Sequence, residues 1–167
     1  MSMGETKRLK GSSIRALQTL NKPFEDGAVF KETNEAGIRV VIRNDKGEIL
    51  AALSENIVMP SLDVIEEILA TQRAVQFALE IDISHSIFEG DSKIVFKAMT
   101  LDVDPFSSIG HFVKDTKSIA SSLMNFSISH TRKQGNSVAY ALARRGRLSS
   151  SLLVWIECLP SDVLILL

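Results

Sequence analysis

The sequence has little of several residue types, and each shortage excludes a class of protein. Its 167 residues include a single cysteine, Cys158, so neither an intramolecular disulfide nor a cysteine-rich zinc site can form. Aromatic residues make up 6% of the chain, which disfavours a surface that binds single strands by stacking bases. No window reaches the roughly 18 uninterrupted apolar residues of a membrane span, because Glu157, Pro160 and Asp162 break the apolar C-terminal stretch. With 45% hydrophobic and 23% charged residues, the composition is that of one globular domain.

Charge is unevenly spread although the formal net charge is −1. Residues 1–24 carry five basic residues against one acid, which leaves 14 basic residues against 19 acids in the remainder. We expect residues 1–23 to be a disordered leader, with a nucleic-acid-binding arm or an organelle-targeting segment as the alternative. Residues 24–167 are expected to form the domain, and the lone thiol fits the nucleus or cytoplasm.

Apolar periodicity predicts a mixed α/β fold. Strands are predicted at Asp26–Phe30, Ile38–Ile42, Glu48–Leu53, Ser86–Glu89 and Phe126–His130. Helices are predicted from Pro60 or Ser61, over Lys93–Met99, after Gly110 and from Asn136. The expected order is βββαβααβα, which gives a five-stranded mixed sheet flanked by helices and followed by an apolar C-terminal extension.

Three acids stand where a core would not need them: Asp26 in the first strand, Glu67 early in a helix, and Asp91 at a strand-to-helix junction. Converging carboxylates repel one another, so a fold that gathers them needs a divalent cation. Oxygen ligands without histidine or cysteine favour Mg²⁺ or Mn²⁺ over Zn²⁺. The alternatives are a turn at Asp26, a dipole-favouring surface glutamate at Glu67 and an N-cap formed by Asp91 with Ser92.

Four segments in this order resemble the ribonuclease H fold, and more closely the plant reverse-transcriptase-like, retroelement-derived type 1 ribonuclease H domains. The segments are DGAVFKETNEAGIRVVIRNDKGEILAA, EEILATQRAVQFALE, IFEGDS and ISHTRKQGNSVAYALARRG. The similarity runs from about Phe24 to the C-terminus. It implies a ribonuclease H-like fold and a Mg²⁺-dependent endonuclease, with Mn²⁺ as an alternative cation, that hydrolyses the RNA strand of RNA–DNA hybrids.

The resemblance assigns Asp26, Glu67 and Asp91 as catalytic and metal-binding residues. Glu67 matches better than Glu66 because alanines follow it three and seven residues later.

The fourth acid of the family pattern is missing. An Asn-x-x-Ala-Asp pattern is expected at the last helix, but Asn136 and Ala139 are followed by Tyr140. A phenol with a pKa near 10 is a poor ligand for a hard cation at neutral pH. The alternative function is therefore a catalytically weak or inactive hybrid-binding module of retrotransposon origin.

Substrate contacts are expected from a basic segment. Residues 129–147 contain five basic residues and no acid: Arg132, Lys133, Arg144, Arg145 and Arg147. These can neutralise phosphates, because hybrids are recognised mainly through shape and backbone contacts. Substrate-binding candidates are Gly27, Arg132, Asn136 and Arg144, with Asn34 as a weaker one. The alternative is a solvated helix face.

Two further features leave alternatives open. His130 or His111 offers a proton shuttle, or each is simply a structural or surface histidine. The apolar tail Leu152–Leu167 is a third candidate function, a protein-interaction surface, which exposure of this tail would support. We otherwise expect a monomer that binds nucleic acid and no membrane.

Overall fold

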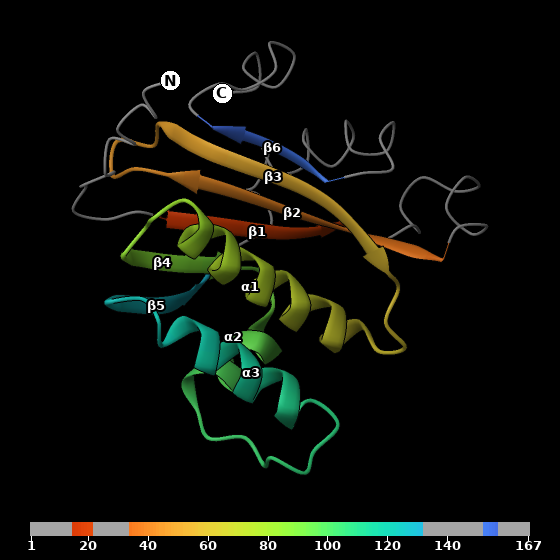
Figure 1. Cartoon of the computed structure of the whole chain (residues 1–167). Coiled ribbons are helices and arrows are strands. Elements are labelled where there is room, and N and C mark those ends of the chain that lie inside the picture. The colour runs from red at the N-terminus through yellow and green to blue at the C-terminus, as the bar shows by residue number, and fades with distance from the viewer. Residues whose placement is uncertain (1–14, 22–33, 132–151, 157–167) are drawn as a thin grey trace, which may run out of the picture.

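The computed structural model describes residues 15–21, 34–131 and 152–156. In chain order the elements are β1 (Arg15–Asn21), β2 (Glu35–Arg43), β3 (Ile49–Val58), α1 (Asp63–Glu80), β4 (His85–Gly90), α2 (Lys93–Thr100), α3 (Gly110–Ala120), β5 (Asn125–His130) and β6 (Leu153–Ile156). The strands form one six-stranded sheet in the order β5-β4-β1-β2-β3-β6 (Figure 1).

The sheet is mixed, as predicted. β1 runs parallel to β4, and β4 runs parallel to β5. β2 is antiparallel to both of its neighbours, β1 and β3, and β6 is antiparallel to β3. A helix connects β3 to β4, and two more connect β4 to β5. Parallel strands need such crossover connections, which usually contain a helix.

The predicted hairpin between β2 and β3 is confirmed. The side-chain oxygen of Asn44 accepts hydrogen bonds from the backbone N–H groups of Lys46 and Glu48, at 3.0 and 2.9 Å. Gly47 has a φ of 78°, a conformation that side chains with a Cβ rarely adopt. The predicted turn residues Asn44 and Gly47 therefore form the observed connection between the two strands.

The main core lies between the sheet and α1. Alternate residues of β2 face the helix and are buried: Ile38, Val40 and Ile42. Along α1, the small residues Ala70, Ala74 and Ala78 pack in the same cluster. Their short side chains let the helix backbone approach the sheet closely, while Phe77 and Phe88 fill the remaining volume.

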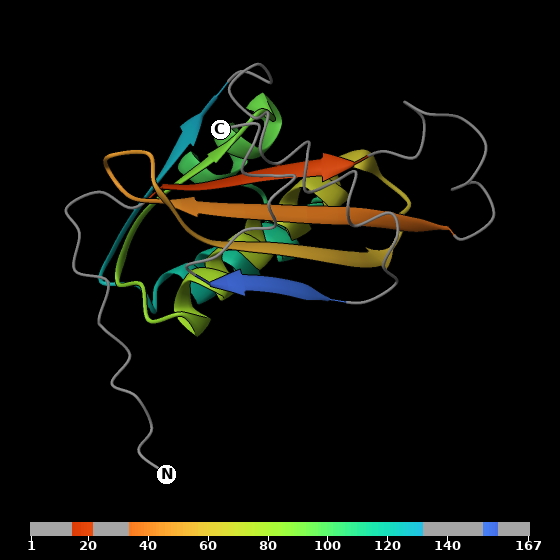
Figure 2. The same cartoon turned by 90° about the horizontal axis from the view of Figure 1, so that it is seen from above.

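The described helices lie on one side of the sheet (Figures 1 and 2). α2 and α3 enclose a second cluster with α1, formed by Ile68, Val95, Ala98, Met99 and Val113. None of the helices in the described part of the chain is long and apolar enough to cross a membrane.

The N-terminal segment differs from the prediction. β1 lies within residues 1–23, which we expected to be a leader, and it pairs with β2 on one side and β4 on the other. Its residue Ala16 is fully buried. The sequence Arg15–Asn21 has few strand-favouring residues, so long-range pairing rather than local propensity makes it a strand. The predicted strand Asp26–Phe30 lies outside the described residues.

The sheet also has six strands where we predicted five. The additional strand is β6, which comes from the predicted apolar extension and pairs with the edge of β3. A short apolar run is compatible with either a strand or a helix, and here the free edge of β3 decides between them. The predicted helix starting at Asn136 lies outside the described residues.

Candidate active site

The topology brings Glu67 and Asp91 to the same level of the sheet. α1 ends where β4 begins, so β4 runs back along the helix toward its N-terminal end. From His85 to Asp91 an extended chain advances about 20 Å. An α-helix covers that length in about 13 residues, and counting back from Glu80 along α1 reaches Glu67.

The angular positions on α1 distinguish Glu67 from its neighbour Glu66. Arg73 bonds to Glu55 of β3, so its side of the helix faces β3. Glu66 lies on that side, because seven residues make almost two helical turns. Glu67 is rotated by about 100° toward Ile68, which packs against α2 and α3. Glu67 therefore lies on the same side of α1 as Ala70 and Ala74, which pack in the main core.

Ser92, rather than Asp91, caps α2. The Ser92 hydroxyl accepts a hydrogen bond from the backbone N–H of Val95 at 3.3 Å. The N-cap alternative for this pair is therefore fulfilled by the serine, and the Asp91 carboxylate is not used for capping. A carboxylate that does not cap the helix is available for another ligand.

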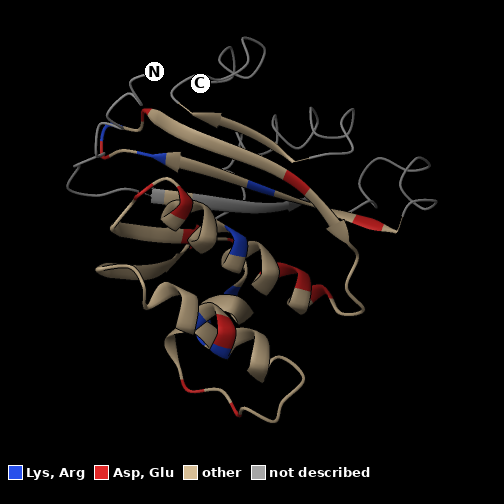
Figure 3. Cartoon of the chain, in the orientation of Figure 1, with Lys and Arg blue, Asp and Glu red and all other residues tan. Residues whose placement is uncertain are grey.

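Both carboxylates are half-buried and unengaged. In the described ranges, neither the Glu67 nor the Asp91 carboxylate accepts a hydrogen bond or forms an ion pair with another residue. Acidic residues gather at the N-terminal end of α1, where the helix dipole favours negative charge (Figure 3). Carboxylates without a protein partner suit a hard divalent cation.

His130 lies beside the backbone of Asp91, a position that the sequence did not predict. Its Nε2 atom is 3.2 Å from the backbone oxygen of Asp91. The backbone N–H of Thr131 donates to the oxygen of Gly90 at 2.9 Å, which aligns the ends of β5 and β4. His111, the other candidate, is exposed on α3 and contacts the ring of Phe112. The parallel register of β4 and β5 sets the position of His130, and it depends on pairing between segments distant along the chain.

The third predicted acid, Asp26, lies outside the described residues. β1 itself contains no acid, and its parallel register with β4 ends at the pair Leu17 and Glu89. Within the described residues, no group of three histidine, cysteine or acidic side chains that could hold a metal ion is present. The described residues therefore supply Glu67 and Asp91 as candidate cation ligands but no complete metal site.

The other predicted site residues are distributed as follows. Gly27, Arg132, Asn136, Tyr140 and Arg144 lie outside the described residues. Asn34 is exposed just before β2, has a φ of 50°, and its backbone oxygen accepts a hydrogen bond from Met59 at 2.9 Å. Its position at the hairpin base explains its backbone geometry without a ligand.

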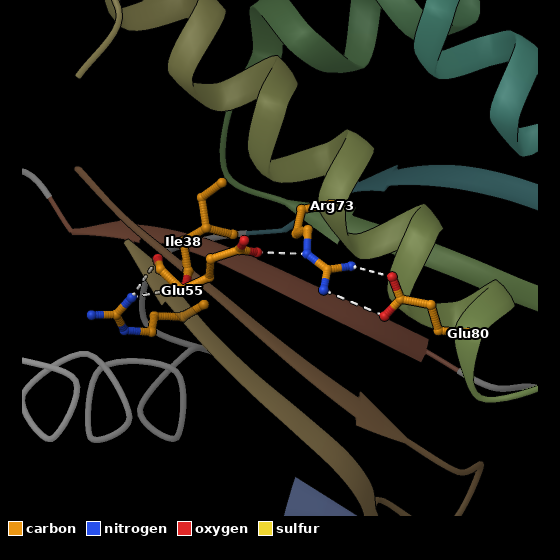
Figure 4. Close-up of polar contacts among 5 residues, drawn as sticks. Ile38, Glu55, Arg73 and Glu80 are labelled. Atoms are coloured by element: carbon orange, nitrogen blue, oxygen red, sulfur yellow. Dashed lines mark hydrogen bonds and ion pairs between the residues drawn. The ribbon is translucent and has the colours of Figure 1, made fainter. Parts of the chain in front are cut away.

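A charged cluster holds α1 against β3. The Arg73 guanidinium bonds to Glu55 at 2.6 Å and to Glu80 at 3.0 Å (Figure 4). Burial by itself would lower the pKa of Arg73, but the hydrogen bonds and negative charges of Glu55 and Glu80 raise it above its ordinary value. Arg73 therefore remains charged and links α1 to β3 through Glu55.

The chain matches a known family profile but no curated protein sequence. A profile described as reverse transcriptase-like matches residues 24–146. A comparison with curated protein sequences finds no match.

Solved structures share the fold at low sequence identity. The ribonuclease H1 of the archaeon Halobacterium salinarum NRC-1 superposes with a TM-score of 0.65 at 19% identity, over 78% of this chain and 94% of that one. LC11-RNase H1, solved in complex with an RNA/DNA hybrid, gives a TM-score of 0.62 at 20% identity, over 77% and 92% of the two chains. A foamy viral protease-reverse transcriptase in complex with RNA/DNA hybrid gives 0.59 at 15% identity, over 80% of this chain and 19% of that chain.

The fold agrees with the profile match: a mixed sheet has helices on one face, and the profile covers most of the chain. The chain belongs to the reverse transcriptase-like family and has the ribonuclease H fold.

Proposed function

We propose that this domain binds RNA–DNA hybrids and hydrolyses the RNA strand in a reaction that requires Mg²⁺ or Mn²⁺. The proposal rests on the pair Glu67 and Asp91, whose carboxylates have no partner in the described ranges and which the element lengths set at about the same level of α1 and β4. Membership of the reverse transcriptase-like family supports it. So do the structures of similar fold that hold an RNA/DNA hybrid.

Glu67 and Asp91 would hold the cation, with Asp26 as the third carboxylate. When bound, such a cation activates water and stabilises the leaving oxygen of a phosphodiester. Partial burial of Glu67 and Asp91 strengthens their attraction for a cation relative to fully exposed carboxylates. His130, whose Nε2 atom lies beside the backbone oxygen of Asp91, is the candidate proton shuttle.

The hybrid would be held through its phosphates and sugars. Gly27, Arg132, Asn136 and Arg144 are the proposed contacts, because positive charge and backbone approach recognise a hybrid without reading base edges. Such binding weakens as salt concentration rises, because each neutralised phosphate releases counterions.

One observation favours a second candidate, a hybrid-binding module without catalysis. Tyr140 replaces the aspartate of the family pattern, so a second cation would lack a carboxylate ligand. In this case the domain would still bind the hybrid, but it would cleave the RNA strand slowly or not at all.

A cleavage assay separates the two functions. A labelled RNA–DNA hybrid is incubated with Mg²⁺ or Mn²⁺ and with the wild type, Asp91→Asn or Tyr140→Asp. Asp82→Asn is the matched control, because Asp82 is exposed in the turn before β4 and asparagine tolerates its φ of 60°. We expect Asp91→Asn to lose about 100-fold or more in rate, since metal assistance is worth several kcal/mol. The control is expected to cleave like the wild type.

The remaining outcomes assign the function differently. Hybrid binding without cleavage by the wild type, with cleavage gained in Tyr140→Asp, identifies the binding module and locates its defect. Absence of hybrid binding in the wild type overturns both functions.

A further inference from the structure

β6 forms one edge of the described sheet. It pairs with β3 on one side, and no strand among the described residues pairs with its other side. An edge strand presents unpaired N–H and C=O groups, and proteins commonly protect such edges with charges, proline or bulges. Residues Leu153–Ile156 include no charged residue and no proline. This edge is therefore suited to pairing with another strand.

The same strand exposes a row of apolar side chains. Leu152, Val154 and Ile156 are 49%, 43% and 56% exposed. They alternate along the strand, so they share one face. The register places Val154 beside Leu53 and Ile156 beside Ala51, both of which belong to the main core. The row thus extends the core-facing surface of the sheet to its edge.

The opposite edge has a different character. Asn125 and Ser127 of β5 are exposed and polar, whereas the half-buried side chains Phe126 and Ile128 face the helices. A polar row gains little from being covered by another molecule. An apolar partner strand is therefore expected to bind at the β6 edge and not at the β5 edge.

We propose that β6 is a self-association surface, on which a second copy of this chain pairs antiparallel through the same strand. Antiparallel pairing about a two-fold axis at Val154 places this residue opposite its own copy. Leu152 then lies opposite Ile156, and Leu153 lies opposite Trp155. Each pair is apolar and no like charges meet, so the strand is complementary to itself.

A dimer differs from the monomer that we expected from the sequence. It also gives a definite form to the protein-interaction hypothesis for the apolar tail, since the exposure that this hypothesis required is present at Leu152, Val154 and Ile156. The pairing is isologous, so it closes at two copies and extends the sheet continuously across both.

The oligomeric state of the full chain tests this proposal. Light scattering after size-exclusion chromatography, over a concentration series, is expected to show a dimer for the wild type. Val154→Lys is expected to be monomeric, because the two-fold axis would place two lysines opposite each other. Val58→Lys is the control, since Val58 is 76% exposed at the far end of β3. Mixing Val154→Lys with Val154→Glu is expected to restore the dimer.

The outcomes decide the proposal either way. A wild type that stays monomeric at every concentration overturns it, and so does a dimer that persists in Val154→Lys or a mixture that remains monomeric. Circular dichroism verifies the fold of each variant. If Val154→Lys does not fold, Leu152→Lys tests the same row from its end, where the lysine would lie opposite Ile156.

Discussion

At the scale of single residues, the neighbours Asp91 and Ser92 have different roles at the junction after β4. The Ser92 hydroxyl satisfies the first turn of α2, and the Asp91 carboxylate remains half-buried without a partner in the described ranges. His130 approaches the backbone of Asp91 from β5. Helix capping and strand register thereby bring Asp91, Ser92 and His130 together, without contacts among their side chains.

Adjacent glutamates on α1 are expected to differ in role. Glu67→Gln is predicted to lose about 100-fold or more in metal-dependent cleavage, because it removes a charged cation ligand. Glu66→Gln is predicted to cleave within a few-fold of the wild type, since Glu66 is buried on the side of the helix that faces β3. Rates on the same labelled hybrid test this prediction. Loss of cleavage in Glu66→Gln with normal cleavage in Glu67→Gln would assign the site to the other residue.

Gly37 is required by a buried arginine. A Cβ at Gly37 would lie 2.9 Å from both terminal nitrogens of Arg39. That guanidinium donates to the backbone oxygens of Ile38 and Glu55, at 2.8 and 3.1 Å, and to the side chain of Asn56 at 3.4 Å. We predict that Gly37→Ala lowers the free energy of unfolding by about 1–3 kcal/mol, because the arginine must move and break these bonds.

Urea denaturation measures this effect, and a second background isolates its cause. In Arg39→Met, the same Gly37→Ala change is expected to cost less, since the obstructing guanidinium is absent. Additive effects of the two substitutions would contradict the explanation.

At the scale of elements, α1 is attached to the sheet by apolar contacts and by one charged cluster. Arg73 links Glu55 of β3 with Glu80 at the C-terminal end of the helix (Figure 4). The cluster is partly buried, so its hydrogen bonds are less weakened by water than those of an exposed pair. It therefore links the helix directly to β3.

Replacing Arg73 by methionine is predicted to lower the free energy of unfolding by about 1–3 kcal/mol, because two carboxylates lose their hydrogen-bond donor. The pKa of Arg73 is raised in the folded state, so its contribution is complete below the unfolded pKa and is lost only as pH rises through the folded value. Both values lie above the neutral range. The difference in stability between wild type and variant is therefore expected to stay constant from pH 7 to about pH 10.

Thermal unfolding at several pH values checks this expectation. A matched control is Arg73→Lys, which retains a charge but loses the forked geometry and should lie between the two. A difference that disappears already near pH 8 would assign the effect to another group.

At the scale of the whole molecule, cation binding should be linked to stability. A ligand that binds the folded state alone stabilises it by about 1.4 kcal/mol when its free concentration is ten times its Kd. For a domain of this length, that energy corresponds to a rise of a few degrees in the unfolding midpoint, about 3–6 °C. We predict this rise with Mg²⁺ for the wild type and its absence in Asp91→Asn.

Differential scanning fluorimetry measures the midpoint without depending on cleavage. Potassium chloride at matched ionic strength is the control for general screening. An equal rise in wild type and Asp91→Asn would place the cation elsewhere on the molecule.

Much of the fold could be predicted from the sequence. The hairpin of β2 and β3, the helices α1, α2 and α3, and the strands β4 and β5 all have strong local signals, such as the alternation of Ile38, Val40 and Ile42. Of the site, Glu67 and Asp91 could be proposed from motif order. Asp26, Tyr140 and the basic segment stay predictions, because they lie outside the described residues.

The amino-acid sequence by itself determined the family, the alternation of strands and helices, and the acids worth testing, because periodicity, turn residues and motif order are local properties. The tertiary structure alone decided that Arg15–Asn21 is a strand between β2 and β4, that Leu153–Ile156 pairs with β3 as the edge strand β6, and that His130 lies beside Asp91. Each of these depends on partners distant along the chain. Pairing energy between such partners outweighs local propensity, which is weak in both terminal strands.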